Sequence, residues 1–119
     1  MSISWMDYKG KKILYVDHRG SKSQDELLQT LELQEKYCRE SPDKLLILYD
    51  YRDVYVDPKF MERAKKLGKE VLNAKTERSA ILGVTGIRKI LLDADIKFSG
   101  DNVVIFDSEP KAKEYLVNG

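Results

Sequence analysis

The first part of the chain alternates between apolar and polar residues. Residues 3–8 and 12–18 follow this pattern and are joined by a lysine–glycine–lysine turn. Alternation with a period of two predicts a β-hairpin with Trp5, Ile13 and Tyr15, or their neighbours, pointing inward. We therefore expect the chain to begin with two antiparallel strands.

Three later segments are continuous apolar runs. They cover residues 45–49, 81–84 and 103–106. A strand without polar positions needs cover on both faces, which is typical of a central strand in a parallel sheet. The run at 81–84 leads directly through Thr85 and Gly86 into a helical pattern.

Helical spacing of apolar residues occupies the segments between the strands. Ser23 and Glu26 form a capping box before the first helix, which we expect to end near Glu40. Asp57 and Pro58 begin the second helix as N-cap and first helical residue. The four predicted helices cover residues 24–40, 58–74, 87–98 and 109–116.

The resulting order of elements is ββαβαβαβα. It predicts an α/β fold in which an open mixed sheet of about five strands is flanked by helices. The three later strands each follow a helix, so we expect them to be parallel and joined by right-handed crossovers. No linker or repeat interrupts residues 1–119, so we predict a single domain.

Composition excludes several classes of function. Lys and Arg total 21 against 20 Asp and Glu, whereas a nucleic-acid binder normally has a basic excess. The longest apolar runs are far shorter than the ~20 residues of a spanning helix, so we expect no stable membrane insertion. A single cysteine, Cys38, and no signal-peptide pattern at the N-terminus favour a cytoplasmic location.

Polar residues follow the predicted strands, where ligands bind in open parallel sheets. A phosphoacceptor site at Asp50 and Thr85 lacks the acidic pair and the lysine that such a site needs. His18 is the one histidine, and we expect it to be solvated. Asp50 and Asp53 lie in a turn, where aspartate is favoured for local hydrogen bonds. We therefore expect no catalytic residue, no metal site and no cofactor.

Two features of the third predicted helix suggest contact with a ligand or partner. Arg88 and Lys89 lie in its first turn, where positive charge is unfavourable unless an anion offsets it. Leu92 and Ile96 form an apolar ridge away from the predicted core face, which fits a dimer or partner contact.

Three stretches of the chain resemble the SpoIIAA-like group of the STAS superfamily, often labelled STAS/SEC14-domain proteins. They are residues 45–57, residues 80–92 and residues 104–116. The resemblance implies an open sheet flanked by helices and a role in binding a partner protein. In such domains a serine next to an aspartate is the phosphorylated switch. Asp57 resembles that aspartate, but Pro58 and Lys59 stand where the serine is expected.

Our prediction for function is a non-catalytic STAS-like interaction module of regulatory type, without the usual phosphorylatable serine. Its partner is another protein or a second copy of the chain. The alternative is a small anionic or apolar ligand bound at the strand ends. The predicted surface comprises Tyr51, Arg52, Asp53, Tyr55, Asp57, Thr85, Gly86, Arg88, Lys89, Leu92 and Ile96.

Overall fold

A five-stranded mixed sheet forms the centre of the molecule. The computed structural model describes residues 2–86, 89 and 103–119. The strands lie in the order β1-β2-β3-β4-β5, with β1 antiparallel to β2 and all other neighbours parallel. Their bounds are β1 (Ser2–Tyr8), β2 (Lys11–Asp17), β3 (Leu45–Asp50), β4 (Thr76–Leu82) and β5 (Val103–Phe106). The predicted hairpin and parallel strands are confirmed.

The helices begin where the sequence places their caps. The described helical elements are α1 (Gln24–Glu40), α2 (Pro58–Leu67), a π-helical segment (Gly68–Leu72), α3 (Asn73–Lys75) and α5 (Glu109–Asn118). The side chains of Ser23, Asp57 and Ser108 each accept a hydrogen bond from a backbone amide of the following turn. The third predicted helix, residues 87–98, lies outside the described residues.

The π-helical segment changes which residues of the second helix face the core. The spacing from Phe60 predicts an apolar stripe that continues through Leu67 and Val71 to Ala74. Phe60, Leu67 and Val71 are buried, but Ala74 is exposed. A π-turn inserts an extra residue into the helical repeat, so positions after it rotate away from the original face.

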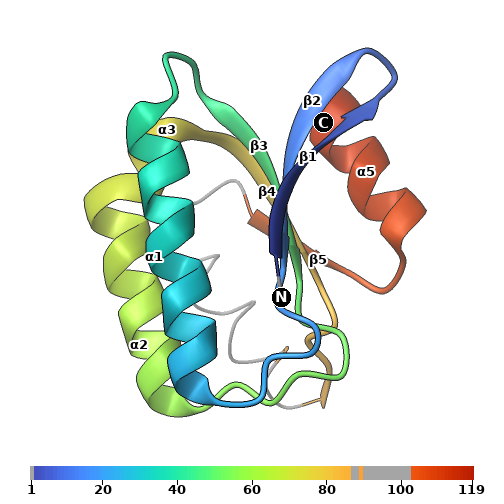
Figure 1. Ribbon diagram of the computed structural model, residues 1–119. Coiled ribbons are helices and arrows are strands. Elements are labelled where there is room, and N and C mark those ends of the chain that lie inside the picture. Colours follow the sequence, from blue (N-terminus) through green and yellow to red (C-terminus); the bar gives the residue numbers. More distant parts are fainter. Residues whose placement is uncertain (1, 87–88, 90–102) are drawn as a thin grey trace.

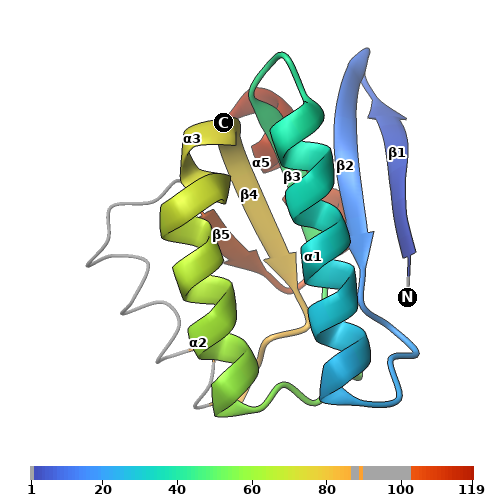
Figure 2. The ribbon, with the colours of Figure 1, turned by 60° about the vertical axis from the view of Figure 1, so that its left-hand side comes forward.

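Two apolar layers hold the sheet between helices. Figures 1 and 2 show α1 and α2 on one face and α5 on the other. The first layer includes Leu14, Ile47 and Phe60, and the second includes Leu48 and Leu116. The described strands follow one another in sequence order across the sheet. An open sheet forms its strand-end crevice where the order reverses, and these five strands contain no such reversal.

Two details of the strands differ from the sequence prediction. Trp5 is 47% exposed, because β1 is the outermost strand beside β2 and receives little cover. β4 covers Thr76–Leu82, so it begins before the predicted apolar run 81–84 and does not continue to residue 84. Gly83 follows with φ of +92°, and a β-carbon there would lie 2.3 Å from the backbone nitrogen of Arg52. The chain turns at Gly83 because only glycine fits against the neighbouring loop.

Candidate functional site

A buried carboxylate organises the carboxyl ends of β2 and β3. Asp17 and Asp50 are register neighbours in these parallel strands. The Asp50 side chain is fully buried. It accepts hydrogen bonds from the Tyr15 hydroxyl at 2.6 Å and from three nitrogens of Arg52, the backbone N at 3.1 Å, Nε at 2.9 Å and Nη2 at 2.6 Å. Sequence reasoning placed Asp50 in a turn and missed this burial.

Two further charged residues extend this group across the sheet. Arg19 donates to both carboxylate oxygens of Asp17 at 3.0 Å, and its Nε lies 3.4 Å from Oδ2 of Asp50. The Nη2 atom of Arg52 lies 3.3 Å from Oε1 of Glu109 at the start of α5. Hydrogen bonds and ion pairs therefore connect β2, β3 and α5. The residues of this network are Tyr15, Asp17, Arg19, Asp50, Arg52 and Glu109.

The arrangement keeps its acids ionised and its phenol neutral. Burial by itself would raise the pKa of Asp50, but hydrogen bonds from Arg52 and Tyr15 outweigh it and hold this pKa below its usual range. For Asp17, the hydrogen bonds from Arg19 likewise outweigh burial, so its pKa is lowered. Burial, with the bond to Asp50, raises the pKa of Tyr15. A general acid or base needs a pKa near the working pH, and these groups are shifted away from it.

His18 is enclosed on the opposite face of the sheet, contrary to the sequence expectation of a solvated side chain. Its ring stacks on Tyr51 at 4.5 Å between centroids and meets Phe60 edge-on at 6.0 Å. Among the described residues, neither ring nitrogen has a hydrogen-bond partner. Burial lowers the pKa of His18 to about 4, although Asp17 and Asp50 favour the charged form. The imidazole is therefore neutral at pH 7.

Hydrogen bonds with β4 and with Gln24 on α1 fix the loop between β3 and α2. The Tyr51 amide donates to the carbonyl of Leu82 at 2.8 Å, which joins the loop to β4. The side-chain amide of Gln24 donates to the Tyr55 carbonyl at 2.9 Å and accepts from the Asp57 amide at 3.1 Å. This bracket fixes the segment that carries Tyr55, whose side chain is 63% exposed.

The structure separates the predicted surface residues into three groups. The first group is exposed or partly exposed and comprises Arg52, Asp53, Tyr55, Asp57, Thr85, Gly86 and Lys89. Tyr51 differs from the prediction, because its ring is only 9% exposed and packs on His18 within the core. Arg88, Leu92 and Ile96 lie outside the described residues. Asp57 also has a structural role, since its Oδ1 caps α2 through the Phe60 amide at 2.8 Å.

Several residues of this region were missed by sequence reasoning. Gln24 forms hydrogen bonds with Tyr55 and Asp57 of the loop, which lie 31 and 33 residues away in the sequence. Tyr15 and Glu109 reach the Asp50 network from different elements. Nothing local distinguishes these residues from ordinary surface positions, because their partners are brought near only by the folded sheet.

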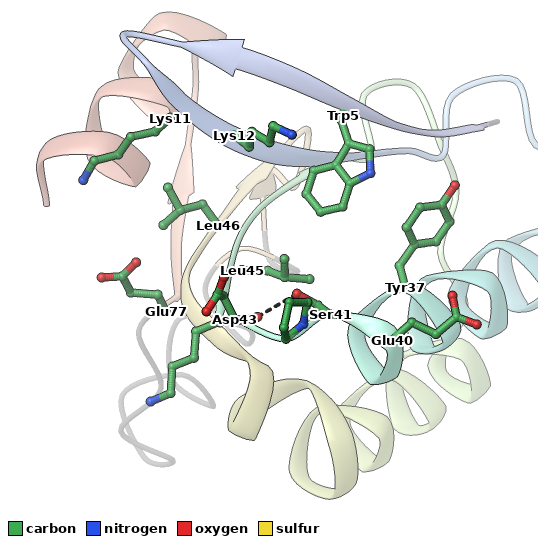
Figure 3. Close-up of a pocket in the computed structure, with 12 residues that line it drawn as sticks. Trp5, Lys11, Lys12, Tyr37, Glu40, Ser41, Asp43, Leu45, Leu46 and Glu77 are labelled. Carbon is green, nitrogen blue, oxygen red and sulfur yellow. Dashed lines mark hydrogen bonds between the residues drawn. The ribbon is translucent and has the colours of Figure 1, made fainter.

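A pocket of about 680 Å³ lies at the other end of the sheet, near the starts of β2, β3 and β4. Figure 3 shows Trp5 and Tyr37 at one side and Leu45 and Leu46 toward the inside. Its charged lining is balanced, with Lys11, Lys12 and Lys44 against Glu40, Asp43 and Glu77. The pocket therefore has no charge preference for a small anion or cation.

The part of the chain that the structure describes contains neither a candidate metal site nor a candidate membrane span. No group of three or more His, Cys, Asp or Glu side chains in this part of the chain could hold a metal ion. None of the described helices is long and apolar enough to cross a membrane.

Comparison with known proteins identifies the fold. No family model and no curated protein matches the sequence. A solved structure does match, that of an uncharacterized DUF3478-family protein from Shewanella loihica PV-4 described as having a SpoIIAA-like fold. The match has a TM-score of 0.69 at 15% identity and covers 97% of this chain and 92% of the other.

The chain has a SpoIIAA-like fold. This confirms the fold expected from residues 45–57, 80–92 and 104–116. At this identity the likeness concerns the fold alone, since one fold can host many functions. The function therefore has to be argued from the site.

Proposed function

We propose that this SpoIIAA-like protein is a non-catalytic interaction module that binds a partner protein through the loop 51–57. The observation that carries the proposal is the placement of Tyr55, which is 63% exposed on a loop fixed by Gln24. Tyrosine is enriched at protein interfaces because it offers a large rigid surface with a polar end. A loop already held in one conformation loses little entropy on binding.

The chemistry beside this loop supports binding rather than catalysis. Both oxygens of Asp50 accept strong hydrogen bonds, and both oxygens of Asp17 accept from Arg19. His18 is neutral and enclosed by aromatic rings. A carboxylate or imidazole that already has its partners, or that substrate cannot reach, is a poor acid–base catalyst.

Site-specific photo-crosslinking tests the proposal. A photoreactive phenylalanine analogue replaces Tyr55 in one variant and Lys69 in a matched variant, because both side chains are exposed. After irradiation in a native lysate, we expect one protein to be joined at position 55 and not at position 69. The same product at both positions, or none at either, would overturn the proposal.

The two hydrogen bonds between Gln24 and the loop provide a second, quantitative test once the crosslinked partner protein has been identified and purified. Gln24→Ala removes both hydrogen bonds to the loop, whereas Gln29→Ala changes an exposed glutamine on the same helix. We expect about a tenfold loss of affinity for the first variant, because binding must then order the loop. Equal affinities would show that the loop is not the binding element.

The same protein also tests the small-ligand alternative. Phosphate, nucleotides and fatty acids are added separately while the melting temperature is measured. A ligand that binds only the folded state raises the melting temperature with concentration. A clear rise combined with no crosslinked protein at Tyr55 would favour ligand binding over the proposed function.

A further inference from the structure

β1 presents an open edge at the side of the sheet. It is the outermost described strand next to β2, as Figure 2 shows. Lys9 and Gly10 close the hairpin with φ of 49° and 82°, the signature of a two-residue type I′ turn. The pair flanking such a turn is hydrogen-bonded, and the pairs alternate from there. The backbone groups of Ile3, Trp5 and Asp7 therefore point away from β2.

Asp7, near the end of β1, is the one charged residue of this edge strand, so the edge carries little of the protection that natural edge strands usually have. Lysine, proline or a bulge commonly prevents such a strand from pairing with another chain. Residues 2–6 contain no charge and no proline. The register with β2 runs without a bulge from Ser2 to Tyr8.

Exposed apolar side chains lie beside the same edge. Trp5 is 47% exposed and meets the ring of Tyr37 on α1 at 6.3 Å between centroids. Leu33, one helical turn before Tyr37, is 46% exposed. Figure 3 shows Trp5 and Tyr37 together at the rim of the pocket. An open strand edge and an apolar strip therefore occur at one place.

We propose that a second copy of the chain binds here, with the two β1 strands paired antiparallel about a two-fold axis. A two-fold interface brings a surface against itself, so it has to be self-complementary. One register pairs all the backbone groups that point away from β2, and it places Trp5 opposite Trp5 of the second copy. Ile3 of each copy then lies opposite Asp7 of the other.

The charge distribution fits a second copy of the chain, and the estimated area fits a weak dimer. The uncharged segment 2–6 brings no like charges together, and each Asp7 faces an isoleucine rather than the other aspartate. The seam follows α1, which is about 25 Å long from its 17 residues. One sheet layer and one helix layer, each about 10 Å thick, give a depth of about 20 Å. The area is then roughly 500 Å² per copy, below the ~800 Å² of a standard interface. The dimer is therefore weak and depends on concentration.

Cysteine crosslinking tests the register directly. In the proposed dimer the Cα atoms of Ile3 and Asp7 of the other copy are about 5.5 Å apart, within reach of a disulfide. The double variant Ile3→Cys with Asp7→Cys should therefore form covalent dimers under mild oxidation. Each single variant is its matched control, because its two cysteines would be about 13 Å apart. The native Cys38 is buried and does not compete.

Sedimentation of the uncrosslinked protein tests the interface itself. We expect a reversible dimer whose dissociation constant rises at least about tenfold in Trp5→Lys, which places two cations opposite one another. Circular dichroism checks that this variant is folded. A protein that stays monomeric at high concentration, a Trp5→Lys variant that dimerises normally, or crosslinking in both single variants would overturn the proposal. Tyr55→Ser should leave the dimer unchanged, which separates this inference from the proposed function.

Discussion

Acid should destabilise this protein through one buried imidazole. His18 has a pKa of about 4 in the folded state, against an ordinary value of 6.5, because burial penalises its charged form. Between these values the unfolded chain binds a proton that the folded chain does not. Stability is therefore complete above about pH 6.5 and is lost as the pH falls toward 4.

The size of the effect follows from the two pKa values. Their difference, 6.5 minus about 4, corresponds to about 3 kcal/mol when each pK unit contributes ~1.4 kcal/mol. About half of this loss should be present midway, near pH 5.2. Asp17 and Asp50 have lowered pKa values, so their stabilising contributions are lost mainly at lower pH, as these carboxylates are protonated.

The matched variant is His18→Phe, which keeps an aromatic ring against Tyr51 and Phe60. Urea unfolding of both proteins is measured from about pH 7.5 to 4. We expect similar stability at neutral pH, since the ring nitrogens of His18 make no hydrogen bond among the described residues. The variant should then gain about 3 kcal/mol relative to wild type at pH 4. Parallel pH profiles, or an NMR titration of this one histidine near pH 6.5, would show that burial does not lower the pKa of His18.

Three further predictions concern stability and reactivity. Gly83→Ala should lower the free energy of unfolding by about 3 kcal/mol or more, because its β-carbon meets the Arg52 backbone. Gly10→Ala, also at positive φ but in open space, should cost only ~1 kcal/mol in the same urea experiment. Asp50→Ala should cost about 3 kcal/mol at neutral pH, and a loss under 1 kcal/mol would contradict a structural role for the network. Burial raises the pKa of Cys38 to about 11, so thiol reagents at pH 8 should label it quickly only after unfolding.

The order of the described elements could be predicted from the sequence because its signals are local. Asp57 and Pro58 predict the start of α2, because aspartate is favoured as an N-cap and proline at the first helical position. The apolar run of β3 indicates burial on both faces, and all six of its residues are buried. Each of these patterns depends on neighbours within a few residues, so no knowledge of distant contacts is needed.

The candidate site could be predicted only in outline. The loop after β3 was predicted as a contact surface, and that role stays a prediction. The part that Gln24 plays in holding the loop was not predicted, because its partners lie more than thirty residues away. Asp50 was expected in a turn and His18 near solvent, and both are buried. Their burial depends on which strand pairs with β3 and which helix covers it. That information is absent from the local pattern.

Local signals in the sequence were sufficient to predict the order of the described strands, the caps of α1 and α2, and the α/β class of this protein. Local propensity and periodicity are sufficient for these features. The order of strands across the sheet, the exposed edge at β1 and the contacts of Tyr15, Arg52 and Glu109 around Asp50 were visible only in the folded structure. These features depend on contacts between residues far apart in the chain, which form only when the sheet and its helices pack together.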